Sequence, residues 1–346
     1  MLLDDDPGGD WTAPGVFRCA PDVYRIPLPL PNDGLRAVNV YAIADGDGFS
    51  LVDSGWVLSE ARDLLVAGLA ELGAGLADVR RFLVTHSHRD HYTLAIAIRR
   101  EFGSRVLLGE HEKPGLDEIN SPGSAQRFHQ QPRLVRAGAA DLLRRLAAVE
   151  PPKFDVADWE LPDEWLTDGS VIKVGDGGDL RALTAVHTPG HTRGHVVFAD
   201  EPGELLFAGD HVLPRITPSL ALEPLPPRSP LADFLTSLEL VRNRPDAVLL
   251  PAHGPVGMRV HQRVDELLAH HTQRLEFSLA AVREGRSTAA EVAAALRWTR
   301  RGTALADLDM FNEMMAVLET VSHLDVLAER GAVTVRMEGD VAHYTI

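Results

Sequence analysis

The sequence predicts a protein of the α+β class made of two unequal parts, and three features carry that prediction. Residues 16–258 alternate short β-rich runs with amphipathic helices, which is the pattern of a layered domain. Residues 259–346 are mainly helical and end in two alternating stretches joined by a turn at 338–340. The length of 346 residues suits one large domain accompanied by a smaller one.

The composition excludes several classes of protein. Hydrophobic residues make up 45% of the chain and charged residues 24%, which are ordinary globular values. The net charge of −16 argues against general binding to nucleic acid, which needs a basic face. A single cysteine, Cys19, excludes a disulfide scaffold and a thiolate metal cluster. No apolar run is long enough for a membrane span, and the acidic start MLLDDDPGGD does not resemble a signal peptide, so we expect a cytoplasmic location.

The elements of the first part follow from the spacing of apolar residues. Residues 1–15 mix Asp, Gly and Pro, which predicts a flexible tail. Runs rich in β-branched and aromatic residues predict strands at 23–31, 38–45, 49–55, 81–86, 106–109, 180–188, 195–200, 204–210 and 247–253. Helical spacing predicts helices at 59–72, 94–103 and 231–243.

Residues 110–165 interrupt this alternation and are interpreted as a helical insertion. They are rich in Pro, Gly and charged residues around one amphipathic helix, expected at 135–149. Trp159 and Trp165 follow that helix. A helical lid with aromatic residues over a site would favour a compact, partly apolar substrate.

The second part, residues 259–346, is expected to be winged-helix-like. Helical spacing covers 260–282, a capping box at Thr288 and Glu291 opens a second helix, and a third is expected at 311–329. In winged-helix proteins the third helix often reads DNA. Here that helix is acidic, and residues 285–346 hold six Arg and no Lys against nine acidic residues. We therefore expect no DNA binding, and expect this part to pack on the first or to form a homodimer contact.

The strongest chemical signal is His86-Ser87-His88-Arg89-Asp90-His91, with the pattern H-x-H-x-D-H after a predicted strand. Imidazole nitrogen and carboxylate oxygen suit zinc and related divalent metals. Alternate residues on a tight turn can direct two imidazoles at one metal, and the last two residues can reach a second. Single polar residues also lie at or just after the ends of four other predicted strands: Asp53, His191, Asp210 and His253.

This ordered set resembles the five motifs of the metallo-β-lactamase superfamily, over residues 20–258. The resemblance implies an αββα sandwich of two mixed sheets. It implies a first metal held by His86, His88 and His191, and a second held by Asp90, His91 and His253. Asp210 would bridge both metals, and Asp53 would anchor a ligand without touching a metal. The PAHGP segment and the long helix after it resemble the branch that carries a C-terminal winged-helix-like domain, with glyoxalase II-like and endoribonuclease-like relatives.

The expected chemistry is hydrolysis of a small-molecule ester-like bond, such as a thioester or lactone. Two divalent metals, most simply Zn, share a hydroxide whose pKa falls towards neutrality, and Asp90 orients it as the catalytic carboxylate. Tyr92 and Arg215 are candidate substrate contacts. No G-x-S-x-G motif offers a nucleophilic serine.

Other functions remain open from the sequence. An endoribonuclease or other phosphodiesterase would need an open basic groove, which the net charge disfavours. A persulfide dioxygenase would hold one iron, whereas this chain has a full second ligand set. A ligand-binding sensor would tolerate a degraded site, and a β-lactamase would usually carry a signal peptide. We expect a small-molecule substrate and no membrane or DNA partner.

Overall fold

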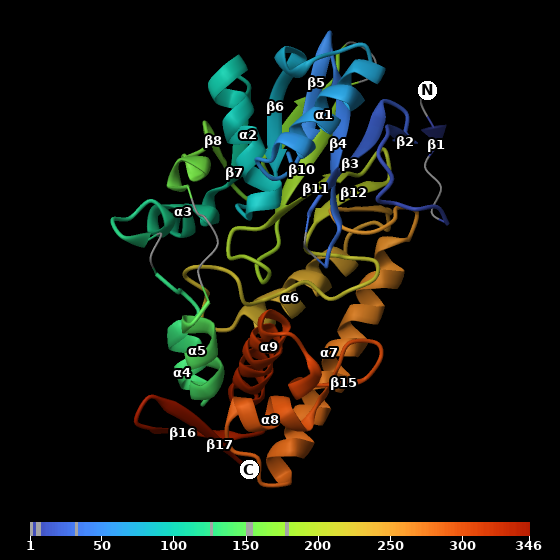
Figure 1. Ribbon diagram of the computed structural model, residues 1–346. Coiled ribbons are helices and arrows are strands. Elements are labelled where there is room, and N and C mark those ends of the chain that lie inside the picture. Colours follow the sequence, from blue (N-terminus) through green and yellow to red (C-terminus); the bar gives the residue numbers. More distant parts are fainter. Residues whose placement is uncertain (1–2, 5–7, 32–33, 125–126, 150–154, 177–179) are drawn as a thin grey trace.

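A computed structural model describes residues 3–4, 8–31, 34–124, 127–149, 155–176 and 180–346. In the upper part of Figure 1, two sheets pack face to face between helices, and the C-terminal helices lie below them. This is the αββα sandwich that the resemblance implied, with mixed sheets.

Within the described residues, the first sheet has eight strands in the order β1 to β8. Strands β2 to β5 are antiparallel neighbours, whereas β5 to β8 are parallel. The strands are β1 (Leu3–Asp4), β2 (Phe17–Ala20), β3 (Val23–Pro29), β4 (Ala37–Asp45), β5 (Gly48–Val52), β6 (Val79–Val84), β7 (Arg105–Gly109) and β8 (Glu164–Leu166).

The second sheet has the order β13-β12-β11-β10-β9. Its strands are antiparallel neighbours except for the parallel pair β12 and β13. The strands are β9 (Val171–Val174), β10 (Arg181–His187), β11 (Val196–Asp200), β12 (Leu205–Gly209) and β13 (Val248–Pro251).

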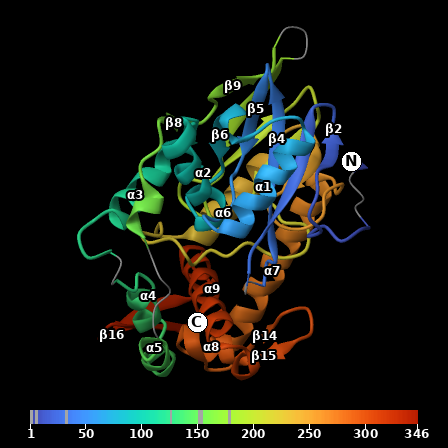
Figure 2. The ribbon, with the colours of Figure 1, turned by 45° about the horizontal axis from the view of Figure 1, so that its top comes forward.

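Helices cover both outer faces of the sandwich (Figures 1 and 2). Helices α1 (Ser59–Glu71) and α2 (Arg89–Phe102) pack on the first sheet, and α6 (Pro230–Arg242) and α7 (Val260–Arg283) pack on the second. Three apolar cores result: one between the sheets and one under each helical layer. The central strands β4, β5, β11 and β12 are buried on both faces, because one face lies between the sheets and the other lies under helices.

The C-terminal part contains helices α7, α8 (Ala289–Ala295) and α9 (Met310–Glu329), followed by the hairpin of β16 (Thr334–Glu338) and β17 (Val341–Thr345). The expected capping box is present, with Thr288 Oγ1 accepting from the Glu291 amide at 3.2 Å. A short pair, β14 (Arg297–Trp298) and β15 (Thr303–Ala304), was not expected. These helices share one apolar core with α6 and the outer face of the second sheet. The winged-helix description stays a prediction.

The segment 110–165 differs from the single helix and lid that we expected. It contains α3 (Lys113–Ile119), α4 (Gln131–Arg136) and α5 (Ala140–Ala147), together with short 3₁₀ helices η2 (Glu110–Glu112) and η4 (Val156–Trp159). The expected helix at 135–149 is broken by Gly138, which has a φ of +74°. Helices α4 and α5 pack against α9 in both views rather than over the sheet ends.

Part of the predicted flexible tail contacts the first sheet. Strand β1 pairs with β2, and Trp11 is buried with its carbonyl oxygen accepting from the Arg25 guanidinium at 2.8 Å. Across the described residues, helices η1 (Leu76–Asp78) and η6 (Leu305–Asp307) complete the secondary structure. No helix in these ranges has the length and apolar character that a bilayer span requires.

Candidate metal centre

The predicted ligands lie in loops that follow strands at one edge of the sandwich. Asp53 follows β5 and His86 follows β6, and these two strands are parallel neighbours. Asp210 directly follows β12, and His253 lies two residues after its parallel neighbour β13. Because the carboxyl ends of parallel neighbours meet at the same edge, these side chains come together although they are far apart in sequence.

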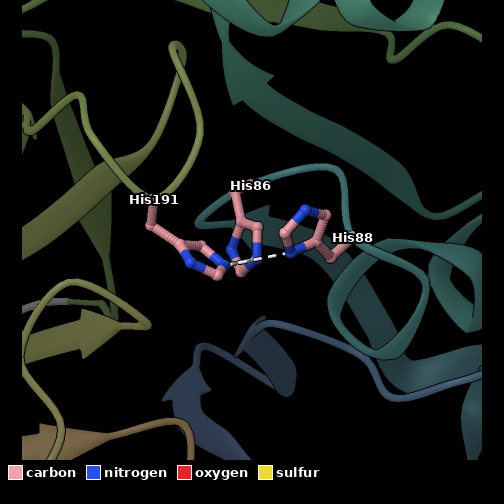
Figure 3. A group of neighbouring side chains, drawn as sticks. All are labelled: His86, His88 and His191. Carbon is pink, nitrogen blue, oxygen red and sulfur yellow. Dashed lines mark hydrogen bonds between the residues drawn. The ribbon is translucent and has the colours of Figure 1, made fainter. Parts of the chain in front are cut away.

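His86, His88 and His191 form the first group of ligand atoms (Figure 3). His191 Nε2 lies 3.1 Å from His86 Nε2 and 2.9 Å from His88 Nδ1. Two neutral imidazole nitrogens at this distance need a proton or a cation between them. One nitrogen of each of the three rings therefore points at a common position, as the ligands of a divalent ion do.

Asp90, His91 and His253 form a second group, beside the first. Asp90 Oδ2 lies 3.5 Å from His91 Nε2 and 3.4 Å from His253 Nε2. Asp90 and His91 are in the first turn of α2, which begins immediately after His88. The first two histidines of the H-x-H-x-D-H pattern thus lie in a turn and belong to the first group. The aspartate and the last histidine lie at the start of a helix and belong to the second group.

Asp210 lies between the two groups, with one oxygen towards each. Its Oδ2 is 3.4 Å from His191 Nε2, and its Oδ1 is 3.3 Å from His253 Nε2. Asp210 therefore lies within 3.4 Å of an imidazole nitrogen of each group. Its backbone is held by His195, whose Nε2 accepts from the Asp210 amide at 3.1 Å.

Hydrogen bonds fix the orientation of the imidazoles. His191 Nδ1 donates to Ser219 O at 2.6 Å, and His253 Nδ1 donates to Ala37 O at 2.7 Å. A carbonyl oxygen can only accept, so the proton is on Nδ1 and the lone pair of Nε2 faces the cluster.

Asp53 orients two further imidazoles from beneath the cluster. Its Oδ2 accepts from His91 Nδ1 at 2.9 Å, and its carboxylate accepts from the amide and hydroxyl of Thr85. Because the Thr85 hydroxyl proton is directed at Asp53, its oxygen accepts from His86 Nδ1 at 3.1 Å. Asp53 has a φ of +60°, an uncommon conformation for a residue other than glycine that places its carboxylate under both rings. This position matches the anchoring role that the resemblance implied.

The electrostatics of the cluster favour a bound cation. Burial lowers the pKa of His91, but the carboxylates of Asp90, Asp53 and Asp210 raise it to about 9. Burial raises the pKa of Asp210, and His253 and His91 outweigh burial to hold it well below its ordinary value. The ionised carboxylates also raise the pKa of His253 well above its ordinary value, against the effect of burial, so the metal-free cluster holds protons on His91 and His253 that a bound cation would replace.

The residues present fit divalent metal ions. Among the described residues, His91 Nε2, His253 Nε2 and Asp210 Oδ1 are buried without any hydrogen-bond partner. An unsatisfied buried polar atom costs about 1–3 kcal/mol, so three of them in one cluster indicate a missing ligand. The donor set of imidazoles and carboxylates is the one that zinc and related metals use.

The two candidate substrate contacts have different surroundings. Tyr92 is completely buried in the core between α2 and the first sheet, and its hydroxyl donates to Glu160 O. The structure therefore gives Tyr92 a packing role in place of a substrate contact. Arg215 is exposed on the loop between Asp210 and Ser219, and its contact with a substrate stays a prediction.

Sequence reasoning missed two residues that support the cluster, and Asn39 is the first. Its Nδ2 donates to Pro251 O and Gly254 O, both at 2.9 Å, and so fixes the loop of His253. An asparagine inside the apolar run VNVYAIAD was the available signal.

Glu112 is the second residue that sequence reasoning missed. It is buried and accepts from the hydroxyls of Ser87 and Thr192, beside two of the ligand turns. Its position in a charged stretch gave no signal of this role.

Comparison with known proteins agrees with this geometry. The family model "Metallo-beta-lactamase superfamily" matches residues 33–253. The chain belongs to the metallo-β-lactamase superfamily. It is similar to a metallo-β-lactamase family protein, TTHA1429, of Thermus thermophilus, with 32% identity, a TM-score of 0.69 and coverage of 95% of this chain and 99% of the other.

Two curated relatives are similar over most of their length. Probable metallo-hydrolase YqjP of Bacillus subtilis is 25% identical over 93% of this chain and 97% of its own. Atrochrysone carboxyl ACP thioesterase nsrC of Aspergillus novofumigatus is 26% identical over 94% of this chain and 84% of its own. Together with the ligand cluster, these relatives identify a metal-dependent hydrolase of this superfamily.

Proposed function

We propose that the chain is a dinuclear hydrolase that cleaves an ester-like bond, a thioester or a lactone, in a small molecule. One observation carries the two-metal part of the proposal: Asp210 directs one oxygen to each of two adjacent ligand groups, at 3.4 and 3.3 Å from their imidazole nitrogens. A carboxylate in this position would bridge two ions. Zinc is the metal that we propose, because imidazole and carboxylate suit it.

The metals would supply an activated water and a Lewis acid for the carbonyl oxygen. In the overall reaction, water adds to the carbonyl carbon, the carbon–sulfur or carbon–oxygen bond breaks, and the leaving atom takes a proton. We assign Asp90 to orienting the water. Burial raises the pKa of Asp90, but His91 and His253 together lower it well below its ordinary value, so the carboxylate is ionised and can accept a hydrogen bond from the water.

The choice of a small thioester or lactone rests on charge and on the relatives. The net charge of −16 disfavours long polyanions such as RNA. Helix α9, which we expected to correspond to a recognition helix, buries most of its length in the common core instead of exposing a basic face. A relative of nearly full coverage is named a thioesterase.

A substrate panel on the metal-loaded protein tests this proposal. We expect turnover of simple thioesters or lactones that stops with a chelator and returns with zinc. A phosphodiester such as bis-nitrophenyl phosphate should be cleaved far more slowly. Preferred cleavage of phosphodiesters, or oxygen consumption with a persulfide and one iron per chain, would overturn the assignment.

A further inference from the structure

Ser87, which separates His86 from His88, is held on every side by the segment 110–165. Its amide and hydroxyl both donate to Glu112 Oε2, the amide at 3.4 Å. Its carbonyl oxygen accepts from the Trp159 indole nitrogen at 2.9 Å. The backbone that carries two imidazole ligands is therefore set by residues from the two ends of this segment.

The same carboxylate also holds the turn that carries the third imidazole. Glu112 Oε1 accepts from the Thr192 hydroxyl, directly after His191, and the Gly194 amide also donates to Glu112. This turn approaches so closely that a Cβ on Gly194 would lie 2.1 Å from the Glu112 amide nitrogen. Glycine is thus required for the carboxylate to reach both turns.

The second ligand group is anchored elsewhere. His91 is oriented by Asp53, and His253 by the carbonyl of Ala37. Glu112, by contrast, is 2% exposed and directs its carboxylate to the two turns of the first group. The two groups therefore share Asp210 and the Asp53–Thr85 pair, whereas the hydrogen bonds of Glu112 reach turns of the first group.

We propose that Glu112 is a positioning residue that joins the two turns of the three-imidazole group and thereby sets the metal affinity of that group. The proposal rests on the metal centre of the proposed function, and not on which substrate is cleaved. A carboxylate can accept hydrogen bonds on both oxygens, one for each turn, whereas a glutamine can accept on one oxygen only. The segment that we expected to be a lid acts in this way as a support for the metal site.

Metal binding to Glu112→Gln tests the proposal without relying on activity. We would titrate the metal-free protein with Co²⁺, follow the visible absorption of the bound ion, and measure zinc retained after dialysis by mass spectrometry. Partners that orient metal ligands typically contribute 10- to 100-fold to affinity. We therefore expect one of the two ions to bind roughly 10- to 100-fold more weakly, and the other to change by less than about threefold.

Two backgrounds identify which ion is affected. In His253→Ala the three-imidazole group stays complete, so Glu112→Gln should weaken the remaining ion. In His191→Ala that group is lost, so the added Glu112→Gln change should have little further effect. Asp45→Asn is the matched control, because Asp45 is a buried carboxylate with three donors, Ser50, Arg81 and the Gly175 amide, remote from the cluster. It should leave both ions unaffected.

If Glu112→Gln does not fold, as judged by circular dichroism, Thr192→Val replaces it. This change removes one hydroxyl donor to Glu112 and keeps the shape of the side chain. It should weaken the same ion by a smaller factor. The proposal would be overturned if a folded Glu112→Gln variant bound both ions with wild-type affinity. If Glu112→Gln does not fold, the same result in Thr192→Val would overturn it. Substrate results do not enter this test, so its failure is distinct from failure of the proposed function.

Discussion

The carboxylate of Asp210 is the residue on which the two ligand groups depend together. Its backbone amide is fixed by His195, and its two oxygens are divided between His191 and His253. A change at Asp210 should therefore affect both ions, whereas a change at an imidazole should affect mainly one.

Asp210→Ala should lose both metal and hydrolytic activity, because the bridging oxygens are removed from both groups. We expect bound metal well below one ion per chain after dialysis and turnover reduced by more than about 100-fold. Metal content and kcat on the same sample check this, with Asp45→Asn as the control that keeps both. Wild-type activity in Asp210→Ala would contradict the proposal that Asp210 bridges two ions.

Asp45 should contribute to stability in a pH-dependent way. Burial raises its pKa, but hydrogen bonds from Ser50, Arg81 and Gly175 outweigh burial and lower it below the ordinary value of 3.8. Since the folded pKa is below the unfolded one, this contribution is present above about pH 4 and is lost as the pH falls through the folded pKa. Denaturant unfolding of metal-free wild type and Asp45→Asn should differ at pH 6 and converge towards pH 3. A constant difference would contradict the role of the ionised carboxylate.

The ligand residues were predictable because few residue types bind metal and their spacing is distinctive. His86, His88, Asp90 and His91 all enter the cluster, as do the isolated residues after later strands. Glu112 was not predictable, because its contacts join segments 25 and 80 residues away. The substrate contact proposed for Tyr92 failed because adjacency to a motif does not determine on which side of a helix a side chain lies.

At the scale of elements, the turns after the strands place the ligands. Gly209 precedes Asp210 with a φ of +50°, and a Cβ there would lie 2.7 Å from His195 Nε2 and from Thr85. The turn after β12 therefore depends on glycine both for its conformation and for its close contact with the residues that hold the ligands.

Gly209→Ala should displace Asp210 and weaken metal binding. The left-handed conformation costs roughly 1–2 kcal/mol for alanine, and the contacts add to this cost. Gly339→Ala is the matched control, since Gly339 has a φ of +61° with no atom within 4 Å of its Cβ position. Metal retention and thermal unfolding of both variants check this prediction. If both variants retained the same amount of metal and unfolded at the same temperature, the close contacts of Gly209 with His195 and Thr85 would have no effect.

Most elements could be predicted because their apolar period is regular. The expected helix at 231–243 appears as α6, and the expected hairpin around 338–340 appears as β16 and β17. The helix expected at 135–149 became α4 and α5, since Gly138 adopts a left-handed conformation that ends the first helix. Amphipathic spacing continued past this glycine, so the pattern alone could not locate the break.

At the scale of the whole molecule, the C-terminal helices form one core with the sandwich. This core joins α4 and α5 to α9, with an ion pair of 2.6 Å between Arg136 and Asp325. The position of the segment 110–165 could not be predicted, because it depends on contacts with residues 189 positions later in the chain. A homodimer, which we expected from the acidic C-terminal part, stays a prediction.

Removal of metal should lower the stability of the whole chain. An ion that binds only the folded state adds about 2.7 kcal/mol at a free concentration 100 times its Kd. In addition, the metal-free cluster leaves buried atoms of His91, His253 and Asp210 unsatisfied. Chelator treatment should therefore lower Tm, and stoichiometric zinc should restore it. A Tm independent of metal would contradict binding at these buried atoms.

Metal content by mass spectrometry, with thioester and lactone assays on the same freshly purified sample, tests the proposed hydrolase most directly. We expect about two zinc ions per chain and turnover of one of these substrate classes. One iron per chain, with no hydrolysis of either substrate class, would contradict it.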